Sequence, residues 1–102
     1  MIKKIFLITF LFCSFYVFSQ NQYTISGYVQ DNQSGENLIG VSIYDKQTLK
    51  GTASNQYGFY SLTMKEGEYE ITYSFIGYKS ITENITLNKD IRLNIALNND
   101  AI

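Results

Sequence analysis

The sequence predicts an all-β domain of seven strands, an antiparallel β-sandwich that follows an export signal. Three observations predict this fold. Apolar and polar residues alternate with a period of two from Tyr23 to Leu97, and Gly, Asn and Asp interrupt the alternation at short intervals. No segment after residue 20 keeps the 3.6-residue apolar period of an amphipathic helix. Period-two alternation is typical of a sandwich or barrel in which each sheet buries one face.

The first residues, 1–19, are predicted to form a helical signal peptide. Two lysines precede an almost wholly apolar run at 5–18. Val17 and Ser19 are small enough for the −3 and −1 positions of a signal peptidase site. We therefore expect cleavage after Ser19, which leaves Gln20 as the new N-terminus.

Two other roles for this segment are less well supported by the residues. A transmembrane anchor needs ~20 apolar residues, and the apolar run is shorter than that. Lipidation at Cys13 needs small residues just before the cysteine, where Phe12 stands instead.

Cleavage leaves an acidic domain without thiol chemistry. Cys13 is the only cysteine and leaves with the signal peptide, so no disulfide can form. Eight basic residues less Lys3 and Lys4 leave six, against nine acidic residues, a net charge of −3. This balance argues against nucleic acid as a partner, because nucleic-acid binding needs a basic face.

The first three strands are separated by polar connections. Residues 23–30 alternate strictly, and 31–37 are rich in turn-forming Asp, Asn, Ser and Gly. Residues 38–46 place Val and Ile on one face. A short strand at 49–54 then leads to a turn at 55–58. Because the chain has no proline, its tight turns depend on Gly, Asn and Asp.

The last four strands show the clearest alternation. Residues 59–64 end at a turn, 65–68, which leads into 69–75, and the remaining strands are 79–87 and 91–97. The residues expected on the inward faces are, in chain order, Ile25, Gly27, Val29, Val41, Ile43, Tyr60, Leu62, Met64, Tyr69, Ile71, Tyr73, Ile81, Ile85, Leu87, Ile91, Leu93, Ile95 and Leu97.

Two glycines interrupt predicted strands. Gly27 and Gly40 lie where a side chain would be expected, which usually marks a bulge or a close approach of another backbone segment.

Catalytic chemistry is poorly represented. Histidine is absent, which removes Ser-His-Asp triads and the usual zinc ligands. Glu66, Glu68 and Glu70 form the only acidic cluster, and Glu68 and Glu70 share one strand face, as a catalytic carboxylate pair of a retaining glycosidase would. We interpret them as a solvated outer face. We predict no catalytic, cofactor-binding or metal-binding residues, and no cofactor.

Two further groups of residues allow a functional and a structural interpretation. Asp31, Asn32 and Glu36 could hold a hard cation such as calcium, but we interpret them as turn-forming residues. Tyr28 and Tyr44 fall on the outward parity of their strands. Exposed tyrosines suit recognition of sugars or proteins, but the interpretation we favour is the ordinary β-propensity of tyrosine on a half-covered face.

Several short motifs resemble a known family. They lie in order at 25–29 (Ile-Ser-Gly-Tyr-Val), 35–43 (Gly-Glu-Asn-Leu-Ile-Gly-Val-Ser-Ile), 51–62 (Gly-Thr-Ala-Ser-Asn-Gln-Tyr-Gly-Phe-Tyr-Ser-Leu), 67–71 (Gly-Glu-Tyr-Glu-Ile) and 74–78 (Ser-Phe-Ile-Gly-Tyr).

Together these motifs resemble the carboxypeptidase-regulatory-like domain, a transthyretin-like (prealbumin-like) Greek-key β-sandwich. In Bacteroidetes this domain often stands at the N-terminus of TonB-dependent outer-membrane receptors. The resemblance covers about residues 23 to 97. Asn37 departs from it, because the family often has proline at this position.

The resemblance implies a β-sandwich domain at 20–98 and a tail or linker at 99–102. It implies a non-catalytic accessory domain of an outer-membrane receptor, located in the periplasm or outer membrane of a Gram-negative bacterium, with a contact or spacer role in nutrient uptake. The expected partners are periplasmic proteins or the rest of the receptor. The sequence holds no plug or membrane strands, so it is expected to be either a receptor fragment or a stand-alone exported binding module for glycan or protein.

Overall fold

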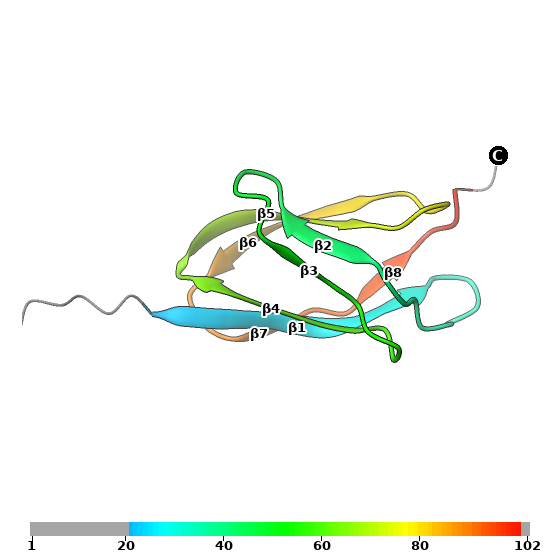
Figure 1. Ribbon diagram of the computed structural model, residues 1–102, viewed down its shortest axis with the longest axis horizontal. Coiled ribbons are helices and arrows are strands. Elements are labelled where there is room, and N and C mark those ends of the chain that lie inside the picture. The colour runs from blue at the N-terminus through cyan, green and yellow to red at the C-terminus, as the bar shows by residue number, and fades with distance from the viewer. Residues whose placement is uncertain (1–20, 101–102) are drawn as a thin grey trace, which may run out of the picture.

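The computed structural model describes residues 21–100, which form eight strands in two sheets (Figure 1). The predicted signal peptide, 1–19, and its cleavage site lie outside the described residues. In chain order the strands are β1 (Gln22–Asp31), β2 (Ser42–Asp45), β3 (Gly51–Ala53), β4 (Phe59–Lys65), β5 (Gly67–Ser74), β6 (Ile81–Leu87), β7 (Ile91–Arg92) and β8 (Ile95–Leu97).

The two sheets pack face to face as a β-sandwich, which confirms the predicted fold class (Figure 1). One sheet has the order β4-β1-β7, and β8 also pairs with β1. The other has the order β3-β2-β5-β6, and all of its pairs are antiparallel.

The last predicted strand, 91–97, is divided into β7 and β8, and both run parallel to β1. The division lies at Leu93 and Asn94. The Leu93 amide donates to the Ser26 carbonyl at 2.7 Å, and the Tyr28 amide donates to the Asn94 side-chain oxygen at 2.9 Å. A side chain therefore takes the place of a backbone acceptor and interrupts the ladder.

Gly27 makes this arrangement sterically feasible. A β-carbon on Gly27 would collide with the Leu93 carbonyl. The close backbone approach expected at Gly27 is therefore present. The same expectation at Gly40 is wrong, because Gly40 has open space around it and a left-handed φ of 81°, which makes it a turn residue.

The core lies between the sheets and contains most of the apolar residues of inward parity, although Ile81, Ile91 and Leu93 are only half-buried at its margin. It comprises Ile25, Val29, Leu38, Val41, Ile43, Tyr60, Leu62, Met64, Ile71, Tyr73, Ile85, Leu87, Ile95 and Leu97. Tyr69 was expected among them but is only half-buried, because its hydroxyl reaches out of the sandwich and donates to the Lys65 carbonyl at 2.6 Å.

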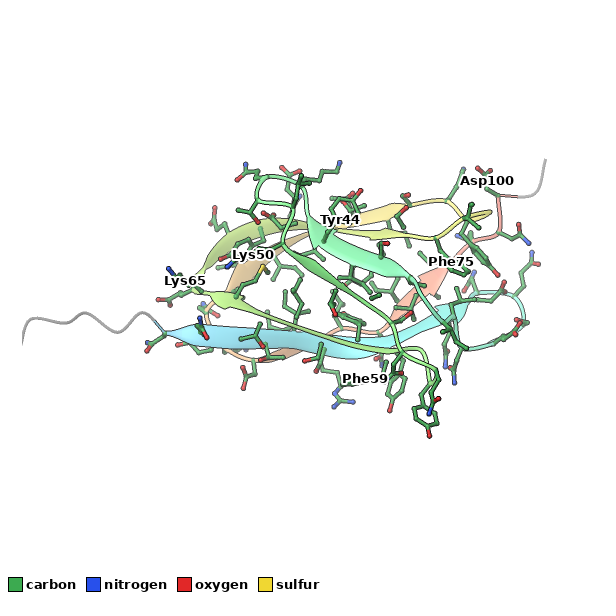
Figure 2. The ribbon with its side chains drawn as sticks, in the orientation of Figure 1. Tyr44, Lys50, Phe59, Lys65, Phe75 and Asp100 are labelled. Carbon is green, nitrogen blue, oxygen red and sulfur yellow. The ribbon has the colours of Figure 1, made fainter. Side chains whose placement is uncertain are left out.

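The segment after β8 returns to the tip of the β5–β6 hairpin. Tyr78 and Asn99 form an antiparallel bridge. The Lys79 amide donates to the Asn98 carbonyl at 2.9 Å, and the Asp100 amide donates to the Gly77 carbonyl at 2.8 Å. This segment links the two sheets, and Phe75 and Asp100 lie at the same end of the molecule (Figure 2).

Candidate interaction surfaces

Among Asp31, Asn32 and Glu36, the candidate cation ligands, the side chains of Asp31 and Asn32 are engaged in hydrogen bonds with other residues. One oxygen of the Asp31 carboxylate accepts the amides of Gln33 and Ser34 at 2.7 and 3.0 Å. Its other oxygen accepts the Tyr78 hydroxyl at 2.6 Å.

These hydrogen bonds, that from Tyr78 foremost, hold the pKa of Asp31 below its usual value. The side-chain amide of Asn32 donates to the side-chain oxygen of Asn98 at 2.8 Å. The part of the chain that the structure describes contains no cluster of acidic, cysteine or histidine residues suited to a metal ion. The turn interpretation of these residues therefore fits the geometry.

Asp45 is a buried carboxylate with a structural role in the β2–β3 connection. It accepts both the amide and the hydroxyl of Thr48, at 2.9 and 2.8 Å, and the amide of Glu70 at 3.3 Å. Burial raises the pKa of Asp45, but these hydrogen bonds together outweigh burial and the pKa is lowered. Its charge is therefore used to close a turn.

The outward-facing glutamates of β5 line a shallow concavity of about 430 Å³. Glu68 lies opposite Thr86, and Glu70 lies opposite Asn84, in the β5–β6 register. The residues around the concavity are Gln47, Glu68, Tyr69, Glu70, Asn84, Ile85 and Thr86. The expected solvated outer face is thus present, and it is hollowed and carries two carboxylates with amide and hydroxyl neighbours.

Sequence reasoning missed the residues that complete this concavity. Asn84 and Thr86 join the glutamates only through the register of the β5–β6 hairpin. Gly77, with a φ of 83°, lies at the centre of that hairpin. Centring the turn on Gly77 would have placed Glu68 opposite Thr86 from the sequence alone.

A second surface is aromatic and lies on the outer face of the β4–β1 sheet. The rings of Tyr28 and Phe59 pack edge to face with centroids 5.3 Å apart. Tyr28 is 39% exposed, and Tyr57, in the adjacent turn, is 62% exposed. Phe59 lies on the lower side of the view (Figure 2). Tyr44, which was also expected to face outward, is half-buried.

A third feature is the set of sheet edges. At the ends of the sheets lie β3, β4, β6, β7 and β8. Of these, only β4 and β6 are as long as seven residues. β4 is in contact with β3, whereas the main contacts of β6 are with β5 alone. The described residues form no helix long and apolar enough to cross a membrane.

The sequence is similar to two receptors. It is 33% identical over 91 residues to a TonB-dependent receptor of Formosa agariphila, covering 88% of this chain and 9% of the receptor. It is 40% identical over 73 residues to the TonB-dependent receptor SusC of Bacteroides thetaiotaomicron, covering 72% of this chain and 7% of that receptor. The chain therefore spans less than a tenth of the length of these relatives.

Solved structures share the fold at low sequence identity. A cohesin–X-dockerin complex of Acetivibrio cellulolyticus has a TM-score of 0.63 and 16% identity, covering 74% of this chain and 56% of that one. A DUF3823 family protein of Parabacteroides merdae has a TM-score of 0.57 and 16% identity, covering 79% of this chain and 48% of that protein.

At the level of families, residues 25–102 match the CarboxypepD_reg-like domain. This match takes in β1 through β8 except for the first residues of β1, so it covers both sheets and the surfaces described above. The chain therefore belongs to the family of carboxypeptidase-regulatory-like domains.

Proposed function

We propose that this chain is a non-catalytic accessory domain of a TonB-dependent outer-membrane receptor, exported to the periplasm, where it acts by contact or spacing during nutrient uptake. The observation that carries this proposal is the similarity to two such receptors over 88% and 72% of the chain. Both curated relatives are receptors, which favours this role over a stand-alone module that binds glycan or protein.

The side chains support a role without catalysis. The chain has no histidine, and its one cysteine belongs to the predicted signal peptide. The remaining groups with proton-transfer chemistry are carboxylates, lysines and phenols, and the hydrogen bonds of Asp31 and Asp45 serve turns. General acid–base catalysis at neutral pH needs a group whose pKa lies near 7 in a substrate site. We expect no hydrolase activity toward peptide or ester substrates, with or without added zinc.

The role in uptake is tested by deletion of residues 23–97 from a full-length receptor that carries this domain. Uptake or assembly should be impaired, while substrate binding to the inserted barrel stays largely intact. Surface labelling of the barrel checks that it is inserted in both strains. Loss of substrate binding by a properly inserted receptor would make the domain a ligand site and contradict the proposal.

A replacement separates contact from spacing. An unrelated β-sandwich of similar size, inserted in place of residues 23–97, keeps the spacing and removes every specific contact. If the replacement restores uptake fully, the domain acts as a spacer. If uptake stays impaired, the surfaces of this domain contribute through a partner.

A further inference from the structure

The outer edge of β6 is one of the two longest sheet edges in the described part of the chain. β6 extends from Ile81 to Leu87 and pairs with β5 on one side only. The edges of β3, β7 and β8 are shorter. The edge of β4 is as long as that of β6, but β4 is in contact with β3. An uncovered edge presents backbone donors and acceptors that can pair with an added strand.

The C-terminal residues of the described chain already pair with the segment that leads into β6. Residues 98–100 run antiparallel to 77–79, with the Tyr78–Asn99 bridge and the backbone hydrogen bonds from Lys79 and Asp100. Before residue 98 the chain diverges, because β8 pairs with β1 in the other sheet. The uncovered part of the edge therefore begins at Ile81, directly after a stretch that is paired in the manner of a strand.

Carboxylates lie on both faces of the sheet near this edge, and Lys46 lies beside Glu70 on the side of β5 away from β6. On the outer face, Glu68 and Glu70 line the concavity beside Thr86 and Asn84 of β6. On the inner face, Glu83 is half-buried at a position where its neighbours Ile81 and Ile85 are apolar. No lysine or arginine lines the concavity. This charge pattern suits a cationic partner.

We propose that the edge of β6 binds an extended segment of a partner protein in which lysine or arginine alternates with other residues. The main chain of the segment pairs with β6. Its outward-facing cations reach across Asn84 and Thr86 to Glu70 and Glu68. Neighbouring strands lie about 4.8 Å apart, so the carboxylate-bearing strand β5 is about 10 Å from the added strand, within reach of extended Lys and Glu side chains together.

Glu83 adds selectivity to the same edge. A purely apolar strand added to β6 would bury the Glu83 carboxylate without a counter-charge, which is unfavourable. Inward-pointing charges on edge strands are a known means of preventing indiscriminate pairing. The edge therefore rejects apolar strands and accepts a segment that supplies a cation.

This inference rests on the proposed function only for the compartment in which the partner is found. Binding at the edge of β6 is therefore tested separately, on the isolated chain. The probe is a synthetic peptide as long as β6 that alternates lysine with valine, and the matched probe carries glutamate in place of lysine. Amide hydrogen exchange of the exported, purified chain is measured with and without each peptide. We expect the lysine peptide alone to slow exchange in β6 and to lose affinity as salt is added.

The matched variants isolate the carboxylates. The double variant Glu68→Gln, Glu70→Gln should bind the lysine peptide about tenfold more weakly, a loss of about 1.4 kcal/mol. The double variant Glu36→Gln, Glu66→Gln changes the net charge equally outside the concavity and should bind as the parent chain does. Unchanged circular dichroism of each variant shows that its fold is retained.

Four outcomes of the peptide experiments would overturn the proposal. They are equal binding of the glutamate peptide, protection of β4 instead of β6, no protection at the highest soluble peptide concentration, and equal loss of affinity in both double variants. Concentration-dependent protection of β6 without peptide would identify a second copy of this chain as the occupant and would also overturn it. None of these outcomes bears on the deletion experiment in the receptor.

Discussion

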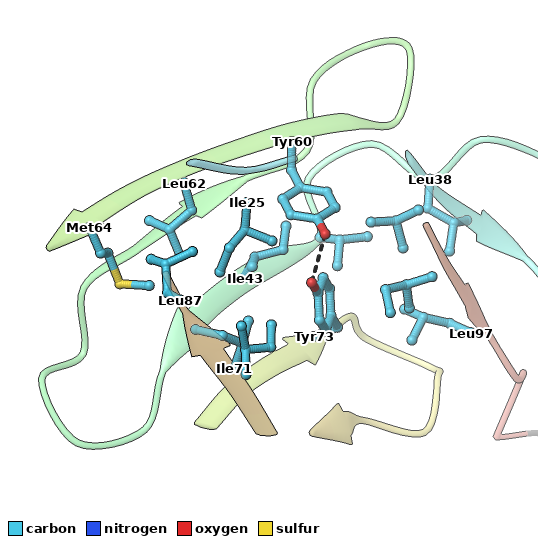
Figure 3. Close-up of a cluster of buried hydrophobic side chains, with 14 residues drawn as sticks. Ile25, Leu38, Ile43, Tyr60, Leu62, Met64, Ile71, Tyr73, Leu87 and Leu97 are labelled. Atoms are coloured by element: carbon cyan, nitrogen blue, oxygen red, sulfur yellow. Dashed lines mark hydrogen bonds between the residues drawn. The ribbon is translucent and has the colours of Figure 1, made fainter. Parts of the chain in front are cut away.

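The phenol oxygens of Tyr60 and Tyr73 lie 2.7 Å apart and join the two sheets through the core (Figure 3). Tyr60 belongs to β4 and Tyr73 to β5, and their rings pack edge to face with centroids 5.4 Å apart. The Tyr60 hydroxyl donates to the Leu93 carbonyl at 2.6 Å. Because Tyr60 has only one hydroxyl proton, Tyr73 must donate to Tyr60. Burial raises the pKa of both phenols, so the pair stays neutral at physiological pH.

This direction of donation predicts unequal effects of removing the two hydroxyls. Tyr60→Phe leaves both the Tyr73 hydroxyl and the Leu93 carbonyl without their partner, and should lower the free energy of unfolding by about 1–3 kcal/mol. Tyr73→Phe removes a single donor and should cost about 0.5–1.5 kcal/mol. Urea denaturation of the two variants measures the difference. A larger loss in Tyr73→Phe would contradict the assigned direction.

A methyl group at Gly27 should separate β1 from the C-terminal strands. The β-carbon of Gly27→Ala meets the backbone carbonyl of Leu93, which cannot move without breaking the Leu93–Ser26 hydrogen bond. We expect a loss of about 1–3 kcal/mol in unfolding free energy, the usual cost of overpacking. Ser61→Ala, on the exposed face of neighbouring β4, is the control and should change stability by less than about 0.5 kcal/mol. Equal stability of both variants would show that β7 can shift at no cost.

The Asp31–Tyr78 hydrogen bond predicts a pH dependence of stability. The pKa of Asp31 in the fold lies below the ordinary value of 3.8, so its contribution is present above that value. The contribution is lost as the pH falls through the lowered pKa. The pKa of Tyr78 is raised, chiefly by the same hydrogen bond, so its contribution is lost as the pH rises through that raised pKa.

Tyr78→Phe tests this linkage. Removing the hydroxyl should move the pKa of Asp31 up toward 3.8 and flatten the fall in stability as the pH drops below that value. Carboxyl chemical shifts followed by NMR report the titration of Asp31. Asp45, whose partners are Thr48 and Glu70, serves as the internal control and should titrate unchanged. Identical titration of Asp31 in both proteins would contradict the role given to Tyr78.

Export predicts a defined N-terminus. If residues 1–19 are a cleaved signal peptide, the protein recovered from the periplasmic or outer-membrane fraction begins at Gln20. N-terminal sequencing or intact mass measures this directly. Replacing Ser19 with a bulky residue such as tryptophan should block cleavage at this site and leave the precursor in the membrane fraction. Recovery of Met1 in the folded exported protein would contradict cleavage.

The strands of the sandwich were predictable because each buries one face. Alternation along β4 and β5 placed Tyr60, Leu62, Ile71 and Tyr73 inward, and the structure buries all four. The alternation is a local property, set by the opposite directions of successive side chains in a strand. The alternation can therefore be read from the sequence without knowing which strands pair. It also predicted that Glu68 and Glu70 face outward.

Pairing between strands was decided by the tertiary structure. No local pattern states that β7 and β8 run parallel to β1, or that Asn94 takes the place of a backbone acceptor opposite Tyr28. The same limit applies to one part of the concavity. A hairpin turn centred on Gly77 sets Glu68 opposite Thr86, but nothing local brings the loop with Gln47 nearby. The sequence by itself determined which face of each strand is buried, because that depends on neighbours along the chain. Only the tertiary structure decided which edges and carboxylates remain available to a partner, because those depend on contacts between residues far apart in the chain.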